Sequence, residues 1–292
     1  MLLSFVCYSD ILGYSQLSKN AIKTGNGPDF LKRLRHALCN AYGRVREHSR
    51  GWGDNSFYAV KVFTDNIVLG YPLHRPDFDE GEPEFGDILN TFAEFQAGLA
   101  MEGFFVRGGI ACGEHYMDDD IVFGQALLEA VDQDKAGGPP RITIAPSALA
   151  KLDRQLGFYG DPEWAPHNKY VLKDCDGAIF LDYLSEAFCV FPEGGILFEI
   201  IEGHRQAIVE GLTVYKGNPG VRAKFEWAAR YHNFICEDFA ENHSVPNSPD
   251  ADEVYAAAAE EAQTLLDHRI DIEALAARPS RLKFTTLESS QE

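Results

Sequence analysis

The sequence predicts an α+β fold: one sheet, followed by a helical region. Apolar runs of strand length alternate with helical patterns in the order β-α-β-β-α-β over residues 2–112. Beyond about residue 185 the character becomes helical. The chain is 45% hydrophobic, with 20 Phe and 12 Tyr, enough to bury a sizeable core. We therefore expect two regions, a sheet domain with its extension over residues 1–185 and a helical region over 186–292 that packs on it.

The first half of the chain shows each expected element by its local pattern. Residues 2–9 are rich in β-formers and predict a buried strand. A helix is expected from Asp29, its N-cap, because apolar residues recur at helical spacing to position 41. Residues 57–63 and 67–71 predict two strands, and the polar triplet between them predicts a hairpin turn. A helix around residues 88–99 and a strand over 104–112 follow.

This order is that of a ferredoxin-like split-βαβ sheet, to which further elements are added. Gly108 and Gly109 lie inside the strand over 104–112, which predicts a bulge or a close approach by other atoms. Next come a helix over 125–135, a Gly-Pro break and a strand over 141–144. Residues 197–212, 221–240 and 252–268 predict three C-terminal helices, and aromatic residues at helical spacing in the second are expected in the core or an interface.

The charge balance restricts the class of partner. Lys and Arg total 26 against 45 Asp and Glu, a net charge of −19. A binder of nucleic acid or of an anionic membrane needs a basic face, so neither partner is expected. A nucleoside triphosphate would need metal ions to neutralise it.

The six cysteines and the N-terminal sequence bear on the compartment. No pair has the Cys-x-x-Cys spacing, which favours reduced, mostly buried thiols. The first residues lack the basic start of a signal peptide, and no apolar stretch approaches the ~20 residues of a membrane span. We therefore expect a cytoplasmic protein.

Two carboxylates have the placement expected of a metal site. Asp10 follows the first strand, and Asp65 lies in the predicted hairpin turn. In a split-βαβ sheet the first and third strands are neighbours, so both carboxylates can converge. Paired carboxylates at strand ends suit divalent metals that hold phosphates. The alternative is that Asp10 caps a helix and Asp65 is an ordinary turn residue.

Three motifs resemble those of class III nucleotidyl cyclases. They read YSDILGY at residues 8–14, KVFTDN at 61–66, and RGGIACG at 107–113 followed by FG at 123–124. Together they cover roughly residues 2–150. The sequences of these motifs are most similar to those of the pyrimidine cyclases of the bacterial Pycsar antiphage system. Residues 169–183 and 221–233 also resemble segments of that subgroup. The resemblance thus spans most of the chain, and residues 1–185 correspond to the cyclase domain with its extension.

The resemblance implies a set of site residues. Asp10 and Asp65 would be catalytic and would bind two Mn²⁺ or Mg²⁺ ions, assisted by the backbone carbonyl of Ile11. Backbone N–H groups from Ile11 through Leu12 and Gly13 to Tyr14 would hold the β- and γ-phosphates at a helix start. Lys61 would contact the base; alternatively it pairs with a carboxylate across the hairpin.

The chain departs from the family pattern at the positions where other members carry an Asn and an Arg. Here those positions hold Leu128 and Asp132, neither of which can bind a ribose or a phosphate as those residues do. Purine-specific members of the family carry an Asp or Thr at the position that here holds Ile121, and Asp120 lies one residue away from it. Arg107, Lys135 and Arg141 remain as cations without an assigned role. The alternative for Arg107 is a strand residue paired with a carboxylate.

The activity implied is conversion of UTP to 3′,5′-cyclic UMP and pyrophosphate in a homodimer, with a separate effector protein reading the product in antiphage defence. Lys61 donates hydrogen bonds, which suits the two carbonyls of uracil slightly better than cytosine. A cytidylate cyclase acting on CTP, a purine cyclase with rearranged base contacts, and a catalytically silent nucleotide-binding or dimerisation module remain the alternatives.

Overall fold

The fold is described from a computed structural model of the 292-residue chain. It covers residues 1–50, 59–63, 65–118, 120–135, 138–160, 165–189, 191–192, 194–243, 253–272 and 278–282. The side chains of residues 42, 44–50, 59–63, 135, 166 and 168 lie outside this description.

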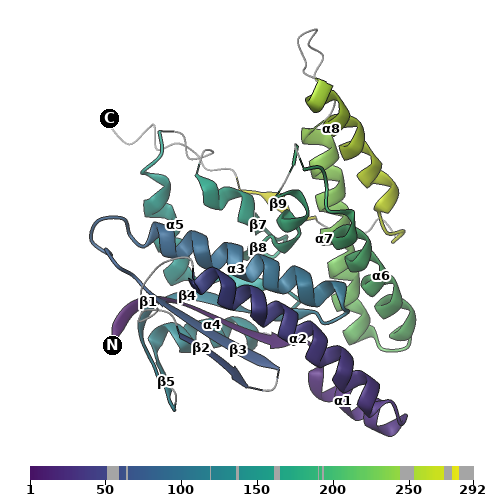
Figure 1. The fold of residues 1–292 in the computed structure, drawn as a ribbon, viewed down its shortest axis with the longest axis horizontal. Helices are drawn as coiled ribbons and strands as arrows, with labels where there is room; N and C mark the ends of the chain where they lie inside the picture. Colours follow the sequence, from purple (N-terminus) through teal and green to yellow (C-terminus); the bar gives the residue numbers. More distant parts are fainter. Residues whose placement is uncertain are drawn as a thin grey trace.

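The described residues form a nine-stranded, mostly antiparallel sheet in the order β2-β3-β1-β4-β6-β8-β7-β9, with β5 paired to β4 (Figure 1). The pairing of β4 with β6 is parallel, and the other pairings are antiparallel. The strands are β1 (Leu2–Ile11), β2 (Ala59–Phe63), β3 (Asn66–Pro72), β4 (Val106–Met117), β5 (Val122–Gly124), β6 (Ile142–Ile144), β7 (Val171–Lys173), β8 (Ile179–Leu181) and β9 (Ser280–Arg281).

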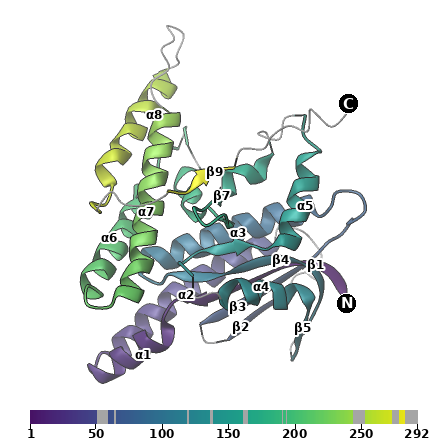
Figure 2. The same ribbon diagram turned by 180° about the vertical axis from the view of Figure 1, so that it is seen from behind.

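Helices cover both faces of the sheet. Helices α2 and α3 lie on one face and α4 on the other, as the two opposite views show (Figures 1 and 2). The helices are α1 (Tyr14–Lys23), α2 (Gly27–Arg50), α3 (Glu82–Met101), α4 (Gln125–Lys135), α5 (Pro146–Leu156), α6 (Phe198–Val214), α7 (Pro219–Asn242) and α8 (Glu253–Thr264), with 3₁₀ turns η3 (Pro166–Tyr170), η4 (Tyr183–Phe188) and η5 (Leu265–His268).

The alternation of side chains along β1 explains the two layers. Phe5 and Cys7 belong to the large core under α2 and α3, whereas Val6 belongs to a small cluster with Ala126 and Ala130 of α4. Neighbouring residues of a strand point to opposite faces, so one apolar run supplies both cores. The expected buried strand at the N-terminus is confirmed, and it lies between β3 and β4 within the sheet.

The C-terminal helices share the main core. Helix α6 packs on α3, and α7 packs on α6 (Figure 1). Phe5, Phe92 and the buried Tyr231 of α7 belong to one hydrophobic cluster. Trp227 and Tyr231 are 6% and 0% exposed, so the aromatic residues of α7 lie in the core as expected. The division at residue 185 stays a prediction.

Several elements differ from the sequence-based expectation. The N-cap assignment of Asp29 is wrong, because α2 begins two residues earlier, at Gly27. Helix α1 begins at Tyr14, at the helix start that the resemblance implies, but the sequence pattern predicts no extent for it; none of its residues is buried. The thiols are all free, but Cys39, Cys175 and Cys189 are exposed, so half of the six are buried. No described helix is long and apolar enough to span a membrane.

Candidate functional site

Strand pairing brings Asp10 and Asp65 together. Asp10 lies opposite Asn66 of β3 on one side and Arg107 of β4 on the other. Asp65 directly precedes β3, and its carbonyl accepts a hydrogen bond from the backbone N–H of Ile11 at 3.3 Å. The two carboxyls form a side-chain hydrogen bond. The interpretation of Asp10 as a helix cap is wrong, because Gly13 is the N-cap of α1.

The Asp10 carboxyl holds its proton up to neutral pH. Burial raises its pKa from 3.8 to about 7, and the hydrogen bond to Asp65 and the charges of Asp65 and Asp134 add to this, while Arg107 opposes it. Two adjacent carboxyls resist ionising together unless a cation lies between them. Within the described residues no group of three or more His, Cys, Asp or Glu could hold a metal. Mg²⁺ is commonly bound by one or two carboxylates together with substrate phosphates, so the pair fits that ion.

Arg107 links the carboxyl pair to α4. Its guanidinium lies 3.6 Å from the Asp10 carboxylate and 2.6 Å from the Asp134 carboxylate. The structure therefore supports the interpretation of Arg107 as a strand residue paired with carboxylates. Asp134 was not predicted as a site residue. The signal was present: Asp134 follows Ala126 and Ala130 at four-residue intervals, and both alanines face the sheet.

Lys224 extends this cluster to the C-terminal helices. It lies on α7 and interacts electrostatically with Arg107 and Asp134. Burial, and then the nearby guanidinium of Arg107, lower the pKa of its ammonium. One charged cluster thus extends from the β2–β3 turn to α7 and consists of Asp65, Asp10, Arg107, Asp134 and Lys224. Sequence reasoning missed Lys224 because no local pattern connects α7 with the end of β1.

Two glycines shape the backbone around these residues. Gly13 has a φ of 74° and begins α1 without a side-chain cap, so the first N–H groups of that helix receive no side-chain oxygen from the cap. A Cβ at Gly108 would collide with the carbonyl oxygen of Tyr8, and one at Gly109 would lie 2.6 Å from the carbonyl oxygen of Ala130. The expected close approach at the glycine pair is confirmed.

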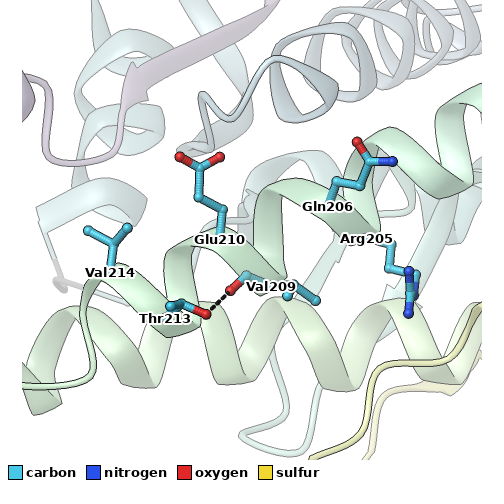
Figure 3. A pocket seen from close by; sticks show the side chains of 6 residues that line it. All are labelled: Arg205, Gln206, Val209, Glu210, Thr213 and Val214. Carbon is cyan, nitrogen blue, oxygen red and sulfur yellow. Dashed lines mark hydrogen bonds between the residues drawn. The ribbon is translucent and has the colours of Figure 1, made fainter.

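A cavity of about 660 Å³ adjoins the end of β1. Leu12 and Gly13 line it together with residues of α1, the end of α3, α6 and α7, among them Lys224. Figure 3 shows Gln206 and Glu210 projecting from one side of α6, away from Arg205. Gln206 and Glu210 line this cavity and Arg205 lines a separate hollow between α6 and α7, while all three also line the pocket on α6 that Figure 3 draws. Of these hollows, the one that reaches the end of β1 is the cavity of about 660 Å³, which Leu12 and Gly13 line.

Other predicted positions lie apart from the carboxyl pair or outside the described side chains. Leu128 is 64% exposed on α4. Asp120 is a solvated turn residue whose N–H donates to Asp118. Arg141 pairs with Asp174 and Asp176, a structural role away from the strand end. The side chains of Lys61 and Lys135 lie outside the described residues. No protein-family model and no curated protein matches this chain.

Proposed function

We propose that this chain is a pyrimidine nucleotide cyclase that converts UTP to 3′,5′-cyclic UMP and pyrophosphate. The main supporting observation is the hydrogen-bonded pair of Asp10, three residues before the Gly13 N-cap of α1, and Asp65, directly before β3. The strand order β2-β3-β1-β4 is compatible with the ferredoxin-like sheet of class III cyclases. Of the three motifs that resemble that family, YSDILGY, KVFTDN and the start of RGGIACG reach this strand end, whereas Phe123 and Gly124 of β5 pair with the opposite end of β4.

The residues at the strand end fit a divalent metal pair. Two neighbouring carboxyls share a proton where a cation could replace it, and Asp10, Asp65 and the carbonyl of Ile11 are the groups that would hold Mn²⁺ or Mg²⁺. Bound there, the ions would neutralise the phosphates and lower the pKa of the ribose 3′-hydroxyl.

The chain itself would position the substrate and handle the proton. The N–H groups of Gly13 and Tyr14 at the start of α1 point a partial positive charge at the β- and γ-phosphates. The 3′-oxygen forms a bond to the α-phosphorus, and the bond from that phosphorus to the pyrophosphate oxygen breaks. Asp10 or Asp65 would accept the hydroxyl proton and release it to water.

The biological setting is proposed on the motif resemblance alone. A class III site is completed across a homodimer, so two copies would form two equivalent sites. The cytoplasm, an antiphage role and a separate effector protein that reads the cyclic nucleotide belong to the same proposal.

A substrate screen tests the activity. The purified chain is incubated with ATP, GTP, CTP or UTP and Mn²⁺, and products are identified by mass spectrometry. We expect cyclic UMP and pyrophosphate from UTP. Cyclic CMP as the main product would instead identify a cytidylate cyclase, and a purine product would contradict the pyrimidine assignment.

An Asp65→Asn variant separates an enzyme from a silent module. We expect a loss of at least about a hundredfold in turnover, with little change in melting temperature, because the variant removes a charged ligand but keeps the shape. Asp153→Asn, on the exposed face of α5, is the matched control and should keep full activity. The exposed Leu128 and the acidic Asp132 favour the silent module as second candidate. Binding of UTP with Mn²⁺ but no product from the unmodified chain would select it.

A further inference from the structure

Lys224 of α7 lies at the boundary between the charged cluster and the cavity. It lines the cavity of about 660 Å³ together with Leu12 and Gly13, which join β1 to α1. It also interacts with Arg107 and Asp134, the residues that lead to Asp10. The lysine therefore faces the place where the proposed function puts the triphosphate.

The packing of Phe225 holds α7 at this place. Its ring meets Phe105 edge-to-face at 5.4 Å and stacks on Tyr215 at 5.6 Å. Gly211 of α6 accommodates the same ring, because a Cβ there would lie 2.5 Å or less from three of its atoms. Phe105 directly precedes β4 and is two residues from Arg107, so these contacts fix the backbone of residue 224 beside the start of β4. The position of Lys224 is thus set by core packing.

Lys224 is the cation of the cluster that is available to a ligand. Arg107 is committed to two carboxylates. Across the described residues, the Lys224 ammonium makes no hydrogen bond and no ion pair within 4.0 Å, although its side chain is partly buried. Leaving a charged group partly desolvated without a hydrogen bond, with only the longer-range attraction of Asp134, costs free energy that an anionic ligand would recover.

Lys224 determines whether the charged side chains that line the cavity are balanced or net negative. Its basic lining residues are Arg33 and Lys224, and its acidic ones are Glu102 and Glu210. Arg33 lies over the ring of Phe104, 5.2 Å from the centroid. Removing the charge of Lys224 would leave the lining net negative, in a protein whose net charge is already −19. A polyphosphate would then meet repulsion.

We propose that Lys224 binds the triphosphate of the substrate, so that the C-terminal helix α7 supplies the cation missing at Asp132. This inference rests on the proposed function for the identity of the substrate. The ammonium is a compact point charge, which suits a phosphate oxygen without requiring the planar geometry of an arginine. The helical region would then complete the active site as well as cover the sheet.

Binding of inorganic tripolyphosphate and of UTP, measured by calorimetry, tests the inference without turnover. We expect Lys224→Gln to weaken both about tenfold, the effect of losing one charge-assisted contact, and Lys224→Arg to retain most of the affinity. Uridine, which has no phosphate, should not distinguish the variants. Lys216→Gln is the control, because Lys216 is exposed and lines the other hollow. Circular dichroism confirms that each variant is folded.

The two proposals fail by different results. If tripolyphosphate binds the unmodified chain and Lys224→Gln alike, or binds neither, Lys224 has no such role, whatever the enzyme makes. If binding depends on Lys224 but no triphosphate yields a cyclic product, the cyclase proposal fails and the phosphate site stands. In an active enzyme, we expect Lys224→Gln to raise KM for UTP about tenfold, and an unchanged KM would overturn the inference.

Discussion

The carboxyl of Asp10 resists ionisation because burial and the neighbouring Asp65 and Asp134 all disfavour its charge. Its side chain is 18% exposed, so water stabilises the charge incompletely. A carboxyl kept in this state destabilises the fold at neutral pH unless a ligand compensates for it. Such a cost is typical of sites that serve function.

Asp10→Asn is therefore expected to stabilise the free protein at alkaline pH. The folded chain keeps a proton on Asp10 up to about pH 7, whereas the unfolded chain loses it near 3.8. Relative to the Asn variant, the wild-type protein therefore loses free energy of unfolding as the pH rises from 3.8 to about 7. The difference between the two proteins is largest above that range. Urea unfolding in EDTA at pH 8 should show a gain of about 1–3 kcal/mol, reduced for partial exposure.

The same comparison at pH 4 should show little or no gain, because wild-type Asp10 is then protonated when folded. Asp153→Asn should leave the free energy of unfolding unchanged at both pH values. A gain that does not depend on pH would mean that charge on Asp10 is not the cause. The variant should also have lost cyclase activity, which separates stability from function at this position.

At the scale of elements, the contact between β1 and β4 determines where the charged cluster lies. Gly108 faces Ser9 in the register, and the carbonyl oxygen of Tyr8 occupies the space a Cβ would need. We expect Gly108→Ala to destabilise the fold by about 2–4 kcal/mol in urea unfolding, because backbone cannot yield as a side chain can. Gly98→Ala is the control: it lies in α3 with open space around it, and should stabilise by up to about 1 kcal/mol.

The sequence predicts the longer elements well because their apolar periodicity survives in the fold. The strands of the hairpin and of β4 and the helices α3, α4, α6 and α7 lie where periodicity places them. The strand expected over 141–144 is confirmed as β6, whereas β5, β7, β8 and β9 have two or three residues each, too few to show alternation. The convergence of Asp10 and Asp65 could be predicted from strand order. The approach of Lys224 could not, because it depends on how Phe225 packs against Phe105.

At the scale of the whole molecule, a buried chain of hydrogen bonds joins the extension of the sheet to the C-terminal helices. Tyr183 in η4 contacts His204 at 2.8 Å, His204 contacts His232 at 3.1 Å, and His232 contacts the carbonyl of His268 at 3.0 Å. That carbonyl can only accept, so Nε2 of His232 carries the proton and its Nδ1 accepts from His204. His204 then accepts from the Tyr183 hydroxyl, and both imidazoles are neutral.

This series of buried hydrogen bonds makes the packing of α6 and α7 sensitive to acid. Burial lowers the pKa of His232 from 6.5 to about 4, with Arg205 and His268 adding to the effect and Glu202 and the His268 carbonyl opposing it. Burial also lowers the pKa of His204 well below its usual value. A second proton on His232 would direct two N–H groups at each other across the contact with His204. The fold therefore excludes the charged form.

The free energy of unfolding should therefore decrease as the pH is lowered, and a His232→Gln variant tests this prediction. As pH drops from 6.5 toward 4, the unfolded chain gains a proton on residue 232 that the folded chain does not, so the free energy of unfolding decreases by up to about 3 kcal/mol. Asp10 contributes an opposite slope in the same range, so the informative quantity is the difference between wild type and variant. We expect His232→Gln to be less stable at pH 7.5 but to lose less stability on acidification. His36→Gln, exposed on α2, should keep the wild-type slope, and equal slopes in all three proteins would show that the buried chain does not couple the C-terminal helices to pH.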